Sequence, residues 1–307
     1  MTQDRGIALL NALIMVAAIS AVAAGLMLRA ETSRSRVEHV QISEQAMLHL
    51  DAAELLIDPV LRADWEADQN LDHLLEGWAL ERFGADIDRA QLAGQITDLQ
   101  GLFNVNALSD PGDLAAVQAF ERLLRGLGLP VALAREVAGF VQARGPVLVE
   151  EYSARDIPLR PPGGPIAGIE ELRLVRGMTS EDYARLLPFV SALPIGTSLN
   201  VNTTPAAVLG AVLPTANPAG IERLVADRGR LPFANAGDFR QRAETLLHPR
   251  VIEQSQAPNG GLGVTSRWFQ VRFDLALDGR ILSRIVTVER STLTGATDIK
   301  NRRADPL

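Results

Sequence analysis

Apolar residues are densest at the start of the chain. Residues 7–28 carry no charge, and the most polar side chains among them are those of Asn11 and Ser20. A helix of that length measures about 33 Å, which is enough to cross the hydrocarbon core of a bilayer. The pattern therefore predicts a membrane-spanning helix over Ile7–Leu28.

The pattern then changes from apolar all round to apolar on one side. Neither Gly nor Pro occurs from Arg29 to Asp58, and apolar residues recur there at helical spacing, at Val40, Met47, Leu50 and Ile57. We therefore expect one continuous helix over residues 7–58, about 78 Å long. Pro59 is expected to end it.

Two fates are open for this segment. Ala21-Val22-Ala23 fits the small-x-small pattern at which secretory signal peptides are cut, so the apolar run could be removed from the mature protein. The alternative is a retained helix that anchors the protein and continues beyond the membrane. The unbroken helical pattern after Arg29 favours the retained helix.

Beyond Pro59 the pattern changes repeatedly between helical and extended stretches. A short helix over Leu71–Phe83 and a strand over Ile96–Val105 are expected first, and a helix capped by Ser109 or Asp110 follows. Thr203 or Thr204 is expected to cap a later helix. Further helices are predicted over residues 132–142, 170–175, 180–190, 206–213, 219–227 and 236–247.

A strand pattern returns near the C-terminus. Apolar residues occupy every second position from Phe269 to Leu277, Asp278-Gly279 signals a two-residue hairpin, and Ile281–Glu289 is the return strand. The chain thus predicts an α+β fold in which a long N-terminal helix packs on a small antiparallel sheet. A helical block interrupts that sheet, which indicates an insertion within one domain rather than a row of domains.

The tripeptide Asn-Val-Asn occurs twice, at residues 104–106 and 200–202. Each copy leaves an extended stretch and enters a helix-like one. Asparagine tolerates the backbone geometry that such corners need. We interpret both copies as corners, with ligand or metal contacts by these asparagines as the alternative.

Composition narrows the possible functions. Hydrophobic residues make up 47% of the 307 residues and charged ones 22%, so most of the chain should fold. The net charge is −7 and Lys300 is the only lysine, which weakens any attraction for nucleic acid. Cysteine is absent, which excludes disulfides and thiolate chemistry. The sequence contains no known catalytic motif. The four histidines, His39, His49, His73 and His248, form no pair with metal-ligand spacing.

Three stretches together resemble one family, the minor pseudopilin K of bacterial type II secretion systems. RGIALLNALIMVAAISAVAAGLMLRAE resembles a prepilin signature, in which a short charged leader ends in Gly6 before the apolar helix. DLQGLFNVNAL is similar to that family's first corner between sheet and helix. IEELRLVRGMTSEDYARLLPFVSALP, followed by LNVNTTPAAVLGAVLP, resembles its helical insertion and the return from it.

The resemblance implies a pilin-like fold interrupted by an inserted all-α domain of helix-hairpin-helix or SAM-like type. It implies cleavage by prepilin peptidase between Gly6 and Ile7, and methylation of the new amine of Ile7. It also implies a single-pass protein of the bacterial inner membrane with a large periplasmic domain. The implied divisions are a leader (1–6), the pilin helix (7–58), the first part of the pilin-like domain (59–109), the insertion (110–194), the second part (195–290) and a flexible tail (291–307).

The family's implied role is structural, not enzymatic. Its members form the tip complex of a periplasmic pseudopilus with minor pseudopilins I and J, and they initiate its assembly for export of folded proteins. Minor pseudopilin H, the major pseudopilin G and the inner-membrane assembly platform are the further implied partners.

One residue departs from the general pilin pattern. Counted from Ile7, the fifth mature residue is Asn11, where most pilins have a glutamate that pairs with the N-terminal ammonium of a neighbouring subunit. A charge pair of that kind matters most in a low-dielectric filament core. A subunit with no neighbour ahead of it has no ammonium to neutralise, so Asn11 indicates a tip position. The alternative is a polar residue that the membrane helix merely tolerates.

The resemblance also raises the possibility of bound calcium. Family members can carry Ca2+ in the insertion, and carboxylates are suitable ligands for it. The candidates are Asp110, Asp113, Glu150, Glu151 and Asp156. A solvated acidic face is the simpler interpretation of each.

A rival function comes from another class. NVNTTPAAVLGAVLP and IERLVADRGRLPFANAGDF also resemble the helix-hairpin-helix modules of membrane-anchored competence receptors, which bind DNA. Such modules need a glycine-rich hairpin whose amides meet a phosphate. The corresponding turns here, Pro214-Thr215-Ala216-Asn217 and Gly177-Met178-Thr179, lack paired glycines. We therefore expect no nucleic-acid partner.

Overall fold

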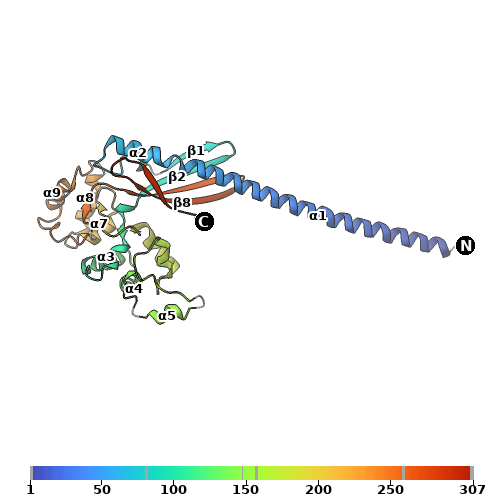
Figure 1. The fold of residues 1–307 in the computed structure, drawn as a ribbon, viewed down its shortest axis with the longest axis horizontal. Helices are drawn as coiled ribbons and strands as arrows, with labels where there is room; N and C mark the ends of the chain where they lie inside the picture. Colours follow the sequence, from blue (N-terminus) through green and yellow to red (C-terminus); the bar gives the residue numbers. More distant parts are fainter. Residues whose placement is uncertain (1–2, 80–81, 147, 156–157, 258–259, 305–307) are drawn as a thin grey trace.

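The computed structural model of the chain describes residues 3–79, 82–146, 148–155, 158–257 and 260–304, and for residues 3–12 it describes the backbone alone. A long helix, α1 (Gln3–Glu54), runs away from a head that contains a sheet and a helical region (Figure 1). Side chains 13–41 of α1 are exposed all round. The head therefore begins to cover this helix only in its last few turns.

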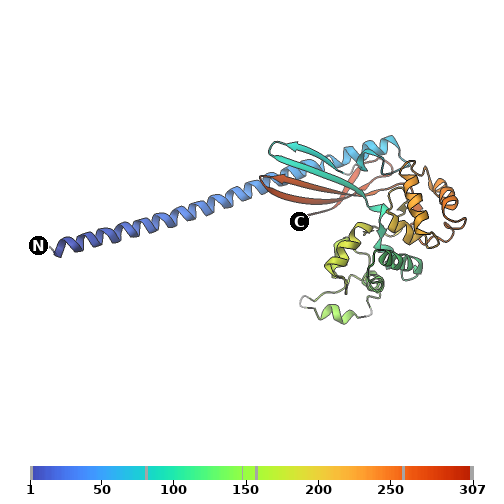
Figure 2. The same ribbon diagram turned by 180° about the vertical axis from the view of Figure 1, so that it is seen from behind.

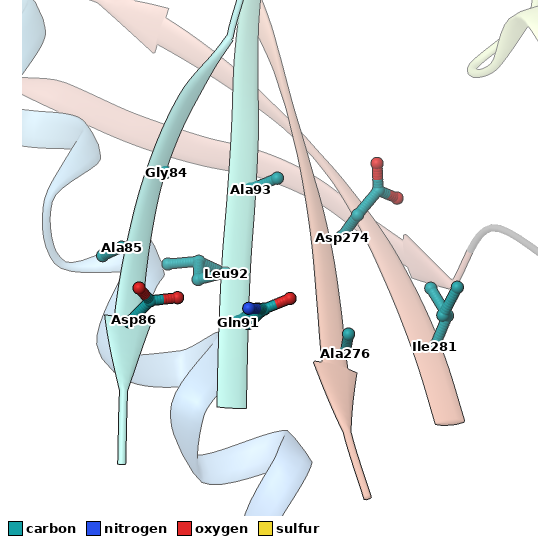
Figure 3. A pocket seen from close by; sticks show the side chains of 9 residues that line it. All are labelled: Gly84, Ala85, Asp86, Gln91, Leu92, Ala93, Asp274, Ala276 and Ile281. Carbon is teal, nitrogen blue, oxygen red and sulfur yellow. The ribbon is translucent and has the colours of Figure 1, made fainter. Parts of the chain in front are cut away.

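The sheet is antiparallel, with five strands in the order β1-β2-β7-β8-β9. Helix α1 lies along one face of this sheet (Figure 2). Burial alternates strictly along β2 and β7, so every second side chain belongs to the core shared with α1 and the others form an outer face. Small side chains such as Gly84, Ala93 and Ala276 leave a hollow of 390 Å³ in that outer face (Figure 3). The strands are β1 (Phe83–Ile87), β2 (Ala90–Asp98), β7 (Trp268–Leu277), β8 (Arg280–Arg290) and β9 (Thr297–Ala304).

Both apolar packing and buried charge hold α1 on the sheet. Leu50 and Ala53 are buried against a core that includes Phe273 of β7. Glu54, only 7% exposed, accepts hydrogen bonds at 2.6 Å from Arg284 of β8 and at 2.6 Å from Arg302 of β9. Because these arginines come from adjacent strands, Glu54 fixes the position of the helix along the sheet.

The expected continuation of the first helix to Asp58 is wrong. Helix α1 ends at Glu54, and a second helix, α2 (Ile57–Ala67), begins after a short break. Pro59 lies in the first turn of α2, where its missing N–H leaves no helical hydrogen bond unmade. The proline therefore belongs to the start of a new helix rather than the end of the old one.

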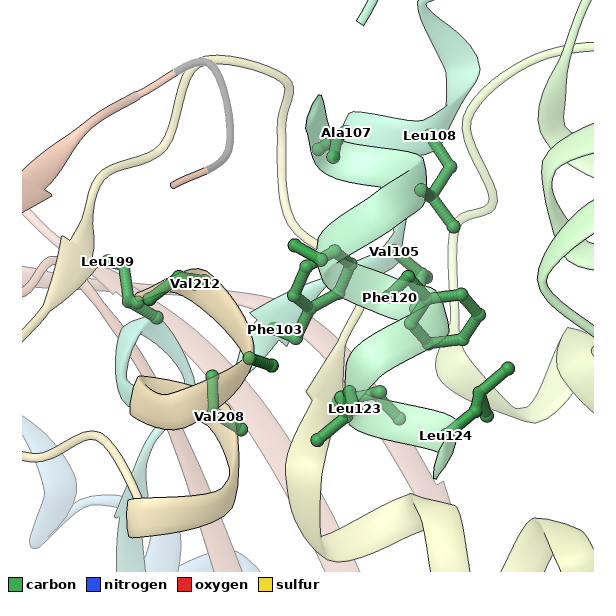
Figure 4. Close-up of a cluster of buried hydrophobic side chains, with 14 of the residues drawn as sticks. Phe103, Val105, Ala107, Leu108, Phe120, Leu123, Leu124, Leu199, Val208 and Val212 are labelled. Carbon is green, nitrogen blue, oxygen red and sulfur yellow. The ribbon is translucent and has the colours of Figure 1, made fainter. Parts of the chain in front are cut away.

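The helical region lies between β2 and β7 in the sequence. Phe103 and Phe120 stack at its centre with ring centroids 5.3 Å apart, and Val208 and Val212 pack nearby (Figure 4). One core runs from Phe103 to Val264, so the two sides of the implied division at residues 194–195 share a single hydrophobic cluster. The α-helices are α3 (Leu114–Gly126), α4 (Leu133–Val141), α5 (Val149–Ser153), α6 (Ser180–Leu186), α7 (Ala206–Val212), α8 (Pro218–Arg228) and α9 (Ala236–Leu246).

Short elements complete the head. Two parallel strand pairs, β3–β4 and β5–β6, lie within the helical region. The strands are β3 (Phe103–Asn104), β4 (Val190–Ser191), β5 (Leu199–Asn200) and β6 (Leu262–Gly263). The 3-10 helices are η1 (Gly77–Ala79), η2 (Leu99–Gly101), η3 (Val105–Ser109), η4 (Ile169–Leu174) and η5 (Leu187–Phe189).

The first part of the sheet differs from expectation. Among the described residues of the range 71–83 only η1 is helical, and Phe83 begins β1, so the predicted helix does not form there. The single strand predicted over Ile96–Val105 is interrupted, because β2 ends at Asp98 and η2 separates it from β3. The hairpin of β1 and β2 turns at Asp88, whose φ of 53° is uncommon for a residue other than glycine. No glycine occurs in this turn, so the sequence carried no local signal for a hairpin there.

The C-terminal segment also differs from the prediction. Residues 291–307 were expected to form a flexible tail, but Thr297–Ala304 form β9 and pair with β8. Its many charged side chains led to the prediction of a flexible tail. In the structure they are the charges that an exposed edge strand carries, which discourage pairing with other chains.

Candidate functional site

Helix α1 is the only helix among the described residues that is long and apolar enough to cross a membrane. Its most apolar window has a mean hydropathy of 2.1, and none of that window is buried in the head. The backbone of Gly6, Ile7 and Asn11 belongs to α1, but their side chains lie outside the described residues. The cleavage site and the interpretation of Asn11 therefore stay predictions.

The first Asn-Val-Asn copy forms a corner and also a long-range clamp. Asn104 caps η3, and its Oδ1 accepts hydrogen bonds from the N–H of Asn106 at 3.1 Å and of Leu193 at 3.0 Å. Asn106 accepts from the N–H of Ile166 at 2.8 Å and donates to its carbonyl at 3.0 Å. Both asparagines are buried, so these bonds replace the water that their amides lose.

The second copy repeats the arrangement. Asn200 Oδ1 accepts from the N–H of Asn202 at 2.9 Å. Asn202 in turn accepts from the N–H of Phe233 at 2.8 Å and donates to its carbonyl at 3.0 Å. The corner interpretation is thus confirmed, and each second asparagine clamps a distant backbone residue as well. The expected caps differ, since Asp113 caps α3 and Thr204 donates to the carbonyl of Asn200.

A buried polar network joins this second corner to the sheet. Asp98, at the end of β2, is 4% exposed and accepts from Thr203 at 2.6 Å and from Ser266 at 2.6 Å. Asn200 donates to the same carboxylate at 3.0 Å. Burial raises the pKa of Asp98. Because its partners come from β5 and from the return to β7, the network sets how the helical region meets the sheet.

Three more carboxylates gather beside this network, around one arginine. Asp64, Asp72 and Glu76 each offer an oxygen within 4.8 Å of the others. Arg290, whose side chain is 4% exposed, pairs with Asp64 at 2.9 Å and with Asp72. Burial raises the pKa of Asp72 to about 6 and that of Glu76 to about 7. Arg290 is paired with two of these carboxyls, and Glu76 accepts from the N–H of His73 and from the indole of Trp78, so protonation relieves the repulsion among the three carboxyls.

This cluster predicts that the fold weakens as pH rises. A carboxyl whose pKa is higher in the folded state stabilises the fold fully below its unfolded pKa and loses that contribution as pH rises through its folded pKa. For Asp72 and Glu76 the loss falls between about pH 4 and pH 7. We expect the free energy of unfolding, measured with urea, to fall on the order of 2 kcal/mol across that range.

The matched variant is Glu76→Gln, which keeps an acceptor for the indole N–H of Trp78, now 2.6 Å from the carboxylate. This variant should have a higher free energy of unfolding than the parent at pH 8, and its free energy of unfolding should change less with pH. Glu66→Gln, at an exposed position of α2, is the control and should do neither. An unchanged pH dependence in Glu76→Gln would show that this carboxyl is not the titrating group.

The predicted calcium ligands are not brought together where the structure describes them. Asp113 caps α3, and Asp110 accepts from the N–H of Gly112 at 2.8 Å. Glu150 and Glu151 are exposed on α5, and Glu151 pairs with Arg176 at 3.2 Å. Asp156 lies outside the described residues. Calcium binding by these residues stays a prediction, and the only carboxylate group that the described part assembles is Asp64, Asp72 and Glu76.

Sequence comparisons decide the family. Two family models, both described as type II secretion system protein K, match residues 101–195 and 199–265. Type II secretion system protein K of Pseudomonas aeruginosa is 32% identical over 307 residues, which cover 94% of this chain and 89% of that protein. The chain belongs to the type II secretion system protein K family.

Other members of the family support the same conclusion. Protein K of Pectobacterium carotovorum is 29% identical over 89% of each chain. A crystal structure of the GspK-GspI-GspJ complex from enterotoxigenic Escherichia coli matches the fold with a TM-score of 0.73 at 23% identity, covering 89% of this chain and 100% of that one. The boundary between the two family models falls between Ile195 and Leu199, shortly before the second Asn-Val-Asn corner.

Proposed function

We propose that this protein caps a periplasmic pseudopilus as a non-enzymatic minor pseudopilin, in a tip complex with minor pseudopilins I and J. The observation that carries this proposal is a chain of the protein K family in which one long, exposed, apolar helix leads directly into the head. The inserted helical region makes that head larger. The related GspK was crystallised with GspI and GspJ.

The N-terminal chemistry of the proposal follows from the sequence. Prepilin peptidase cuts between Gly6 and Ile7, the amine of Ile7 is methylated, and the mature helix stays in the bacterial inner membrane. The support is a charged leader that directly precedes the apolar run. The tip complex then recruits minor pseudopilin H and the major pseudopilin G at the inner-membrane assembly platform.

Asn11→Glu tests the tip position in cells that carry the whole secretion system. A tip subunit offers no ammonium partner to the new carboxylate, which then costs several kcal/mol or takes up a proton. We expect cleavage after Gly6 to continue, while crosslinking to I and J and secretion fall several-fold. Asn11→Gln, which is longer but neutral, is the control and should secrete normally.

The opposite result would identify a different subunit. If Asn11→Glu assembles normally and crosslinks to further copies of itself along the filament, the protein is an ordinary shaft subunit. If Asn11→Gln fails as badly as Asn11→Glu, the effect comes from size rather than charge, and the argument from the missing glutamate is wrong.

A further inference from the structure

The outer face of the sheet forms one wall of a cleft, and the helical region forms the other. The cleft has a volume of 1210 Å³, which exceeds the roughly 300–1,000 Å³ of sites for drug-sized ligands. Its sheet wall comes from β2, β7, β8 and β9, and the opposite wall includes parts of η4, α6 and β4. It is separate from the carboxylate cluster and from α1.

Four neutral side chains form a row across the sheet wall. Residue pairing places Thr97 beside Gln270, Gln270 beside Thr287, and Thr287 beside Asn301. Directly paired residues project from the same face of a sheet, and four strands span about 14 Å. All four line the cleft, yet none makes a side-chain hydrogen bond to any residue that the structure describes. The row is therefore a set of unused donors and acceptors.

The charged side chains of β9 beside the row are already paired. Lys300 contacts Glu289 at 3.1 Å, and Arg303 of β9 pairs with Glu170 of η4 on the opposite wall. The hydrogen-bonding capacity left in the row is that of amides and hydroxyls, which both donate and accept. Such a row favours a neutral ligand rich in hydroxyl and amide groups.

An aromatic side chain and a buried hydroxyl complete the site. Trp268 lies on the same face of β7 as Gln270, lines the cleft, and makes no indole hydrogen bond to the described residues. On the opposite wall Ser191 is 1% exposed, and its Oγ has no hydrogen-bond partner among the described residues. An indole offers a flat apolar surface with one donor at its edge. A sugar ring has the complementary form, with apolar C–H groups on its face and hydroxyls around its rim.

A polypeptide fits these features less well. An extended peptide binds a sheet mainly through main-chain hydrogen bonds to a free edge. This cleft presents the face of the sheet, where the main chains of β7 and β8 at the centre of the row are already paired on both sides. An amphipathic helix needs an apolar groove, whereas the row is polar throughout.

We propose that this cleft binds a neutral oligosaccharide of the N-acetylated hexosamine class. A ring packs on Trp268, and hydroxyl and acetamido groups bond to the row of Thr97, Gln270, Thr287 and Asn301. The cleft has room for more than one ring. This binding activity is independent of the proposed place at the filament tip.

Calorimetric titration of the full chain tests the proposal, in a detergent without a sugar headgroup and with the linear tetramer of N-acetylglucosamine as probe. We expect saturable binding that the double variant Gln270→Ala/Thr287→Val weakens at least tenfold. Because neither side chain makes a hydrogen bond to the part of the chain that the structure describes, the thermal unfolding midpoint should not change. Gln91→Ala is the control, since Gln91 lies on the outer face of β2 but in the separate hollow of Figure 3, and it should bind within twofold of the parent.

Three outcomes would overturn the proposal. The first is an absence of saturable binding to the parent chain. The second is an equal loss of binding in Gln91→Ala and in the double variant. The third is equally strong binding of a neutral capped hexapeptide of alternating serine and glycine, lost in the same double variant, which would mean that the cleft takes polypeptide instead.

Discussion

Replacing Arg290 by methionine is expected to lower the free energy of unfolding by about 3–5 kcal/mol. The guanidinium pairs with Asp64 and Asp72, and it also donates to the carbonyls of Leu61 at 3.2 Å and Ser266 at 2.9 Å. Methionine fills a similar volume but leaves buried carboxylates without a counter-charge. Urea unfolding of the full chain at pH 8, where the carboxyls are most ionised, measures the loss.

The control for this prediction is Arg267→Met. Arg267 pairs with Glu289 in a comparable way, but its side chain is 51% exposed. Exposed pairs contribute about 0–1 kcal/mol. Adding Asp72→Asn to Arg290→Met should recover part of the loss. Similar losses in the two single variants would show that burial of the pair is not what matters.

Replacing Gly6 by valine is expected to abolish processing altogether. A branched side chain directly before the cut prevents the close approach to the backbone that glycine allows. The precursor should keep residues 1–6, as seen from its mass, and secretion should be lost. In the proposed pathway every later step depends on this cut.

Gly25→Ala provides the matched control within the same helix. A Cβ at Gly25 meets no atom within 4 Å, so the helix should tolerate it. Processing should be normal in Gly25→Ala. If Gly6→Val were still processed, to a mature chain that begins at Ala24 or Gly25, the cut would be that of an ordinary signal peptide.

Sequence patterns predicted the elements whose signals are local. The hairpin of β7 and β8 combines a period of two with the turn Asp278-Gly279, and both residues of that turn have positive φ. Helix α4 was predicted to within one residue at each end. The hairpin of β1 and β2 has a short, exposed first strand and no glycine at its turn, so neither signal was present.

The carboxylate cluster was missed for a different reason. Its partners are far apart in sequence: Arg290 is 226 residues from Asp64 and 218 from Asp72. One usable signal existed, since the inward-facing positions Val286 and Val288 of β8 continue to Arg290. An arginine at a core-facing position requires a buried partner. Which carboxylates supply it depends on the tertiary fold.

The mass of the mature N-terminus, measured on protein purified from cells with an active prepilin peptidase, tests the central claim most directly. A pseudopilin of the protein K family should begin at N-methylated Ile7 and keep its membrane helix. A mature chain that begins at Ala24 or Gly25 would identify a cleaved secretory signal and would contradict the account.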